Sequence, residues 1–283
     1  MNIAHSYYLN LEATAGLVTP KWVLTNKATL NDKFEPVEDA WRKKTSAVLR
    51  RKFILLNKLL SIDNLIEIGA HEASVSCELF SIVNKKCYAV EANPFVFNKY
   101  VNTFYVPINY ENLAISKVNG NVELRIPKFS ETLDRADTSL LNRASEADYK
   151  KVNVNSSTLK DFILKKKIQN DKNSCWLDAE GLSYDILESG ENLIESLQIA
   201  LIEVEDISYW ENQHLVLDVI QICLNFNLIP ICRDLDGRGQ YNILFVKNNL
   251  VEKCGGVISD FWQELNSIKI NTEIKSRKFW KRF

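Results

Sequence analysis

The sequence predicts an α/β fold in which helices cover both faces of a mostly parallel sheet. From Leu65 onward, short apolar runs alternate with segments of helical periodicity, which is typical of a parallel sheet with helical crossovers. The last two apolar runs are joined by a turn rich in Asp and Gly, and this closeness predicts an antiparallel edge strand. A chain of 283 residues can bury such a core without disulfides or metals.

Apolar periodicity locates the individual elements. The predicted strands are 65–68, 87–90, 113–115, 122–126, 175–177, 199–204, 228–232 and 242–246. The predicted helices are 37–60, 72–83, 95–102, one that opens at Thr158, and one around 215–224. Asp161, three residues after Thr158, completes a signal that resembles a capping box.

Two extensions flank the α/β domain, which we place at 61–250. Residues 1–60 form an N-terminal extension, irregular at first because Gly16, Pro20 and Pro36 act as breaks, and then helical. We expect this helix to cap the domain; gripping a substrate or a partner is the alternative. Residues 251–283 are expected to form a short helix and a basic, aromatic tail, which either packs locally or touches a membrane surface or an acidic partner.

Composition excludes several classes of protein. The formal net charge is −1, so the overall balance does not indicate nucleic-acid binding. The six cysteines show no CxxC pair and no metal-ligand spacing, which predicts free, buried thiols in a reducing compartment. Neither a signal peptide nor an apolar run long enough to span a bilayer is evident, and we expect a cytoplasmic protein.

The turn after the first predicted strand indicates a ligand site. Open α/β sheets bind ligands beyond the carboxyl ends of their strands, and here Gly69 and Ala70 form a small-residue turn at that point. Glu91 follows the second strand, 22 residues beyond Gly69, where an acidic side chain can accept hydrogen bonds from ribose hydroxyls. A dinucleotide fingerprint would need more glycines to approach a pyrophosphate. Glu72 would repel phosphate, whereas both Glu67 and Glu72 are tolerable beside a positive sulfonium, so S-adenosylmethionine is the favoured cofactor.

A series of segments in fixed order resembles the FkbM family of methyltransferases over about residues 65–247. The segments are Ile66–Ala70, Val90–Pro94, Asn112–Ser116, Thr138–Leu140, Ser157–Phe162, Leu177–Gly181 and Leu201–Val204. The most specific of them is Asp178-Ala179-Glu180-Gly181. The chain departs from the family's usual Gly-Ala-Asn-x-Gly turn at His71 and Ala73, and it carries Trp176 where the family usually has a lysine.

The resemblance implies a Rossmann-like methyltransferase fold, with a seven-stranded, mostly parallel sheet and an antiparallel edge strand. It also implies S-adenosylmethionine-dependent O-methylation, with a carbohydrate or glycan hydroxyl as the acceptor. Glycosyltransferases of the same pathway are the expected partners. The residues that we expect to contact the cofactor are Glu67, Gly69, Ala70, His71, Glu91, Ala92, Asn112, Ala114 and Ser139.

The expected catalytic residues are those that could remove a proton from the acceptor hydroxyl, namely Asp178, Glu180, Glu205 and His71. Each also has a structural alternative. Asp178 or Glu180 can cap the next helix, and His71 can hydrogen-bond backbone in its turn. The carboxylates could hold a divalent ion, but no motif specifies a metal site, and none is predicted.

Two other hypotheses stay open at this point. One is a nucleotide-dependent oxidoreductase or sugar-modifying enzyme on a similar sheet, which the shortage of glycine disfavours. The other is a catalytically silent binding or scaffold module, motivated by the substitutions at His71, Ala73 and Trp176.

Overall fold

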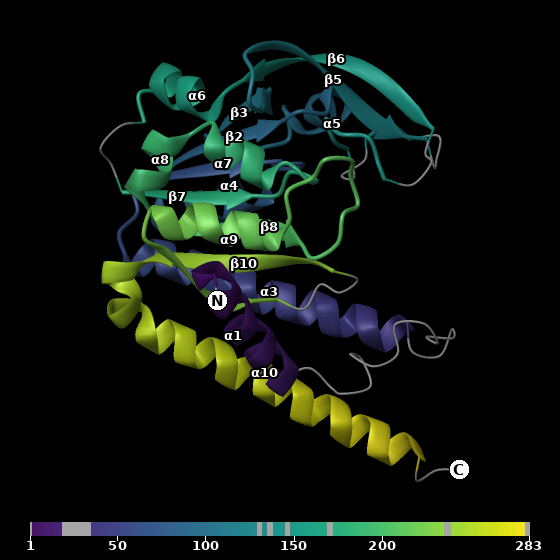
Figure 1. Ribbon diagram of the computed structural model, residues 1–283, viewed down its shortest axis with the longest axis vertical. Coiled ribbons are helices and arrows are strands. Elements are labelled where there is room, and N and C mark those ends of the chain that lie inside the picture. The colour runs from purple at the N-terminus through teal and green to yellow at the C-terminus, as the bar shows by residue number, and fades with distance from the viewer. Residues whose placement is uncertain are drawn as a thin grey trace.

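The computed structural model describes residues 2–18, 35–128, 132–134, 138–144, 148–168, 172–234 and 239–280, without the side chains of 15–18, 35–42, 192 and 268–280. A seven-stranded sheet in the order β3-β2-β1-β7-β8-β10-β9 forms its centre (Figure 1). The strands are β1 Asn64–Ile68, β2 Lys86–Glu91, β3 Asn109–Asn112, β7 Asn173–Leu177, β8 Leu197–Glu205, β9 Leu228–Arg233 and β10 Gln240–Lys247.

The sheet confirms the predicted α/β class and its mostly parallel character. Strands β1, β2, β3, β7 and β8 run parallel to one another, while β10 is antiparallel to both β8 and β9. The antiparallel strand therefore lies one position inside the edge, and β9 occupies the edge itself. As a consequence, the first residue of β10, not its last, meets the carboxyl end of β8.

Helices cover the two faces of the sheet, because successive strand residues point to opposite sides. Ile66 and Ile68 pack in one cluster with α6, α7, α8 and α9, whereas Leu65 packs in a second cluster with α3, α4 and α10. The helices are α1 Ile3–Val18, α3 Glu35–Leu59, α4 Ser74–Val83, α5 Pro94–Tyr100, α6 Leu159–Lys166, α7 Ser183–Glu188, α8 Glu191–Ser196, α9 Val216–Asn225 and α10 Val251–Trp280, with a 3-10 turn at Asn248–Leu250.

A second, three-stranded sheet lies at the opposite end of the molecule from α10 (Figure 1). It consists of β4 Ala114–Ile115, β5 Gly120–Pro127 and β6 Tyr149–Ser157, with β6 in the middle. Its apolar side packs in a small cluster formed by Ala114, Leu124, Ile126 and Val154. The sequence did not predict β6, because few of its residues are apolar, and it did not predict β3, which is short and polar.

The start of the chain differs from the irregular segment that was expected. Residues Ile3–Val18 form the helix α1, which continues through Gly16, and Ala4 and Leu11 are buried in the cluster that contains α9. Pro36 stands in the first turn of α3, where proline is compatible with a helix. Pro20 lies outside the described residues. The sequence of α1 has only a weak apolar face, so local periodicity does not predict this helix. Its packing on α9 accounts for its formation.

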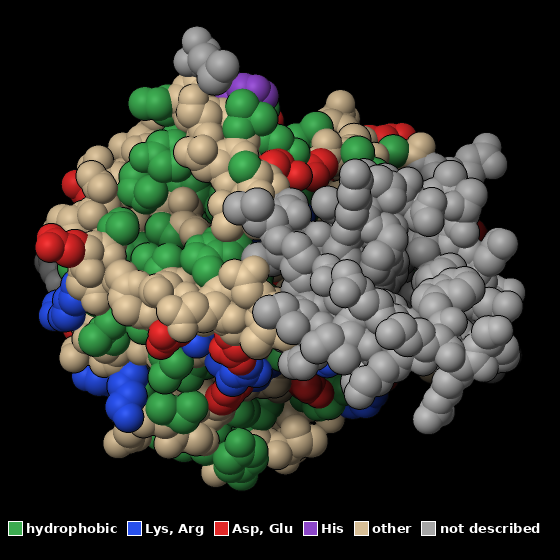
Figure 2. All heavy atoms as spheres, turned by 90° about the horizontal axis from the view of Figure 1, so that it is seen from below, with side chains coloured by type: hydrophobic (Ala, Val, Ile, Leu, Met, Phe, Trp, Pro, Cys, Tyr) green, Lys and Arg blue, Asp and Glu red, His purple; other side chains and the backbone are tan. Residues whose placement is uncertain are grey.

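The C-terminal segment is a single helix, α10, where a short helix and a tail were expected. Phe261 and Leu265 are fully buried against the sheet, and Glu264 forms ion pairs with Arg51 and Lys52 of α3. Figure 2 shows the molecule from below. Among the described residues, this face exposes hydrophobic side chains, with acidic and basic side chains near them. The side chains of the basic, aromatic end lie outside the described residues. The division into domains stays a prediction.

The cysteines agree with the expectation of free, buried thiols. All six cysteines are buried and unbonded. Among the described residues, no helix combines the length and apolar character that crossing a bilayer requires.

Candidate functional site

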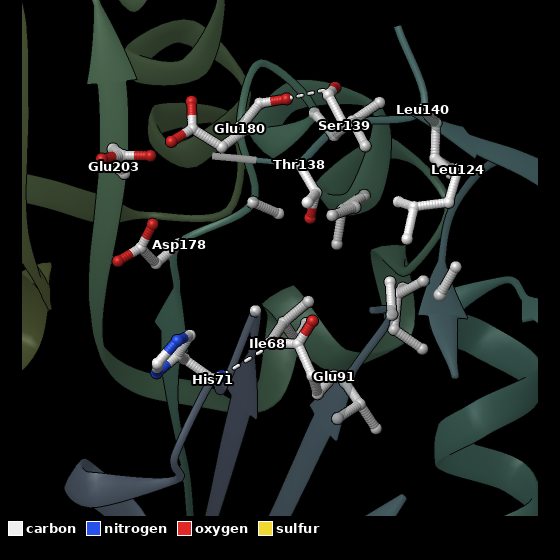
Figure 3. Close-up of a pocket in the computed structure, with 18 of the residues that line it drawn as sticks. Ile68, His71, Glu91, Leu124, Thr138, Ser139, Leu140, Asp178, Glu180 and Glu203 are labelled. Carbon is white, nitrogen blue, oxygen red and sulfur yellow. Dashed lines mark hydrogen bonds between the residues drawn. The ribbon is translucent and has the colours of Figure 1, made fainter. Parts of the chain in front are cut away.

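A cavity of about 330 Å³ lies where the carboxyl ends of β1, β2, β7 and β8 meet. Its other walls come from β4, β5 and the segment 138–140. In Figure 3, His71 and Glu91 lie on one side of the cavity, and Ser139 and Glu180 lie across from them. The described lining residues are Ile68, Gly69, His71, Val90, Glu91, Ala92, Leu113, Ala114, Ile115, Leu124, Thr138, Ser139, Leu140, Asp178, Ala179, Glu180, Leu182, Ile186, Glu203 and Gln240.

The turn after β1 approaches β7 so closely that only glycine fits at its start. Gly69 has a φ of +73°, and a Cβ there would lie 1.7 Å from the carbonyl oxygen of Asp178. The backbone also joins the two strands, since the Asp178 amide donates to the Ile68 carbonyl at 3.0 Å. The glycine therefore lets the turn and the Asp178 strand end stand side by side in the cavity wall.

Glu91 connects the turn after β1 with the end of β2. Its Oε2 accepts a hydrogen bond from the His71 amide at 2.8 Å, and its Oε1 accepts one from the Asn93 amide at 2.7 Å. Burial raises the pKa of Glu91 to about 7, against the opposing effect of these two amides. The carboxylate still faces the cavity, and each oxygen keeps a second lone pair for a ligand.

His71 acts mainly through its backbone in this structure. It has a φ of +45°, its amide donates to Glu91, and its carbonyl accepts a hydrogen bond from the Tyr110 hydroxyl. Its ring centroid lies 5.4 Å from that of Tyr100. These hydrogen bonds belong to the His71 backbone, so the role of its imidazole stays a prediction. His71 also lies in the cavity lining.

The expected cofactor contacts at the end of β2 and β3 divide into two groups. Ala92 and Ala114 line the cavity. Asn112 is paired with Glu91 in the sheet and lies outside the lining, and its side-chain amide donates to the carbonyls of Glu91 at 2.8 Å and Ala92 at 3.1 Å. Asn112 therefore holds the loop that carries Glu91.

Glu67 and Ala70 also lie outside the cavity lining. The Glu67 carboxylate is buried beneath α4 and accepts a hydrogen bond from the Ser76 amide at 2.8 Å, near the start of that helix. Burial raises the pKa of Glu67 to about 7. Ala70 packs in a small cluster with Ala73 and Ala89. The structure gives both residues contacts that support the turn.

Ser139 links the segment above the cavity to the Asp178–Gly181 segment. Its hydroxyl donates to the Glu180 carbonyl at 2.7 Å, and its backbone forms a bridge with Arg125 on β5. Gly181 is required at its position because its φ is +76° and a Cβ would lie 2.5 Å from the indole of Trp210. These contacts fix the backbone of Glu180 at the cavity wall.

Four carboxylates gather at the ends of β7 and β8. Asp178 and Glu203 face each other, and Glu180 lies above them (Figure 3). One oxygen each of Glu180, Glu203 and Glu205 lies within 4.8 Å of the others. Burial and the neighbouring carboxylates raise the pKa of Glu180 and of Glu203. Burial likewise raises the pKa of Glu205 to about 7, although this side chain is outside the cavity lining.

Several lining residues were missed by the sequence analysis. Glu203 is one, and its signal was an acidic residue inside an otherwise apolar strand, two positions before Glu205 and hence on the same side of β8. Gln240 enters the site from β10, and its side chain donates to Glu180 Oε2 at 3.3 Å. Leu124 comes from the separate three-stranded sheet. The last two are positioned by tertiary contacts that no local pattern reveals.

The sheet order and the cavity at its carboxyl edge define a Rossmann-like methyltransferase fold. A family model described as "Methyltransferase FkbM domain" matches residues 67–228, which is more than half of the chain. The protein belongs to the FkbM methyltransferase family. A search of curated protein sequences found no significant match.

Solved structures show distant similarity. The methyltransferase domain of bacterial CtHen1-CN is 9% identical, with a TM-score of 0.39 over 71% of this chain and 99% of that one. The 1,6-didemethyltoxoflavin-N1-methyltransferase of Burkholderia thailandensis, solved with S-adenosylhomocysteine, is 10% identical, with a TM-score of 0.37 over 87% and 91%. Human N-acetylserotonin methyltransferase, solved with S-adenosylmethionine, is 10% identical, with a TM-score of 0.32 over 87% and 68%.

Proposed function

We propose that the protein is an S-adenosylmethionine-dependent O-methyltransferase that acts on a hydroxyl group of a carbohydrate. The observation that carries the proposal is the charge of the cavity. Its described lining includes the carboxylates Glu91, Asp178, Glu180 and Glu203 and contains no lysine or arginine. Such a cavity suits a cationic sulfonium and opposes the phosphates of a dinucleotide.

The nucleoside end of the cofactor fits the side of the cavity near Glu91. The carboxylate is held by two backbone amides and faces a wall of apolar residues that includes Ala92, Ala114 and Leu124. A fixed carboxylate can accept hydrogen bonds from two adjacent ribose hydroxyls, and an apolar wall suits a purine base. Family membership independently supports methyl transfer.

The carboxylates across the cavity suit the acceptor side of the reaction. When bound, S-adenosylmethionine would supply an electrophilic methyl group for transfer to an acceptor oxygen, with S-adenosylhomocysteine as the other product. A sugar hydroxyl is a weak nucleophile, so its proton must pass to a base. Asp178 is the candidate, because it stands at the end of β7 between the Gly69 turn and Glu203.

Two measurements test this proposal. Calorimetry should detect binding of S-adenosylmethionine and S-adenosylhomocysteine, and binding of NAD instead would favour the nucleotide-dependent enzyme.

Incubation with methyl-labelled cofactor and glycan acceptors should then yield a methyl ether, located by mass spectrometry. Label recovered on nitrogen or on a carboxyl group would reject the carbohydrate hydroxyl. Binding of the cofactor without transfer to any acceptor tested would favour the silent module. Glycosyltransferases of the same pathway would supply the acceptor.

A further inference from the structure

We propose that Glu180, Glu203 and Glu205 bind a hard divalent cation, of the Mg²⁺ or Mn²⁺ class, at the acceptor side of the cavity. The three side chains converge from two elements, the segment after β7 and the end of β8. Their nearest oxygens lie within 4.8 Å of one another. Ligand oxygens on opposite sides of a cation stand about 4–5 Å apart, since each lies about 2.0–2.6 Å from the ion.

The second observation concerns the unsatisfied oxygens of this cluster. Glu203 Oε2, in the cavity lining, is buried and has no hydrogen-bond partner among the residues that the structure describes. Glu205 Oε1 is likewise buried without a partner in that part of the chain, although the Glu205 carboxylate as a whole accepts hydrogen bonds from the Gly181 amide and the Gln213 side chain. The two side chains are 8% and 3% exposed, so water contributes little to their solvation. A buried carboxylate oxygen without a partner is costly, and a cation aligned with both oxygens would remove that cost.

The side chains around Glu180, Glu203 and Glu205 also favour a bound cation. Asp178 adds a fourth carboxylate, whereas the positive side chain that acts on Glu180 is Arg143. The guanidinium carbon of Arg143 also lies 4.9 Å from the centre of the Trp210 ring. Carboxylate oxygens of this kind prefer hard divalent ions over softer metals.

The position of the cluster gives such an ion a role, and this part rests on the proposed function. Glu180 and Glu203 line the cavity, so an ion between them would be open to a ligand on that side. A hydroxyl oxygen bound to a divalent cation loses its proton more easily. Asp178 lies beside Glu203 and would receive that proton, which leaves the oxygen free to attack the methyl group.

Binding of Mn²⁺ to the full-length protein, without cofactor or acceptor, tests the site. Electron paramagnetic resonance should show saturable binding of one ion per chain, with displacement by Mg²⁺. The double variant Glu203→Gln/Glu205→Gln should bind Mn²⁺ at least tenfold more weakly. Glu195→Gln, which changes an exposed glutamate of α8, should bind like the wild type.

Thermal unfolding shows whether a variant that binds no Mn²⁺ is still folded. Mn²⁺ should raise the unfolding midpoint of the wild type and of Glu195→Gln but leave the folded double variant unchanged. Absence of binding up to about 1 mM Mn²⁺, or equal affinity in the double variant, would overturn the proposal. Mn²⁺ binding without any S-adenosylmethionine binding would uphold the metal site and reject the proposed function, and the converse result would reject the metal site alone.

Discussion

Glu91 Oε2 and the amide of His71 are joined by a hydrogen bond of 2.8 Å, which ties the end of β2 to the turn after β1. The same carboxylate accepts from the Asn93 amide, so its orientation is set before any ligand arrives. Preorganisation of this kind reduces the entropic cost of binding. It also means that the loss of Glu91 should affect both the ligand contact and the turn.

Removal of the Glu91 side chain should weaken cofactor binding. A charge-assisted hydrogen bond contributes about 1.5–3 kcal/mol, so Glu91→Ala is expected to lower the affinity for S-adenosylmethionine more than tenfold. Calorimetry at neutral pH measures this directly. Glu72→Ala, which changes an exposed glutamate in the same turn, serves as the control and should bind normally. Affinity within twofold of the wild type in Glu91→Ala would remove Glu91 from the site.

Asp178→Asn should separate binding from chemistry. The amide has nearly the same shape but cannot take a proton from the acceptor, so turnover is expected to fall about 10²–10⁴-fold. Affinity for the cofactor should change little, because in the proposed arrangement Glu91 holds the nucleoside end, while Asp178 lies beside Glu203. Steady-state kinetics together with calorimetry distinguish the two effects. Normal turnover would exclude Asp178 as the base.

The buried Glu67 should make stability depend on pH. Burial raises its pKa from 4.5 to about 7 in the folded protein. Protonation of the folded state then exceeds that of the unfolded state between these values, so this group lowers the free energy of unfolding as pH rises through that window. The full effect corresponds to about 3 kcal/mol.

Glu67→Gln should abolish this contribution, since the amide oxygen can still accept from the Ser76 amide. Chemical denaturation from pH 5 to 8 should show the variant gaining stability relative to the wild type as pH increases. Glu195→Gln, a change of an exposed glutamate, serves as the control. A parallel pH profile for Glu67→Gln and the wild type would mean that Glu67 titrates near its ordinary value.

Gly181→Ala should destabilise the protein through its contact with Trp210. A Cβ at Gly181 would lie 2.5 Å from the indole, whereas one at Gly120, also at positive φ, meets nothing within 4 Å. Alanine strains the backbone at both positions, where φ is +76° for Gly181 and +112° for Gly120, but only Gly181→Ala adds a steric clash, for which about 1–3 kcal/mol is expected. Denaturant unfolding measures both variants, and equal losses would show that Trp210 yields without cost.

The sheet was predictable where most residues of a strand are apolar, as in β1 and β8, which are buried on both faces. The helix α1 was not, because its docking on α9 depends on a surface that the local sequence does not encode. Glu91 and Asp178 were found from their places after strands. Glu67 was placed among the cofactor contacts, but the direction of its side chain beneath α4 depends on the face of β1 that it occupies.

The reversed direction of β10 separates two parts of this site. Gly69, Glu91 and the strands that carry them belong to the first half of the sheet, whereas Gln240 reaches Glu180 from a strand that begins at the site. A substitution of Gln240 should therefore alter the surroundings of the Glu180 carboxylate without displacing the turn at Gly69. Under the proposed function, the acceptor side of the cavity is free to change its specificity while the turn proposed to hold the methyl donor stays the same.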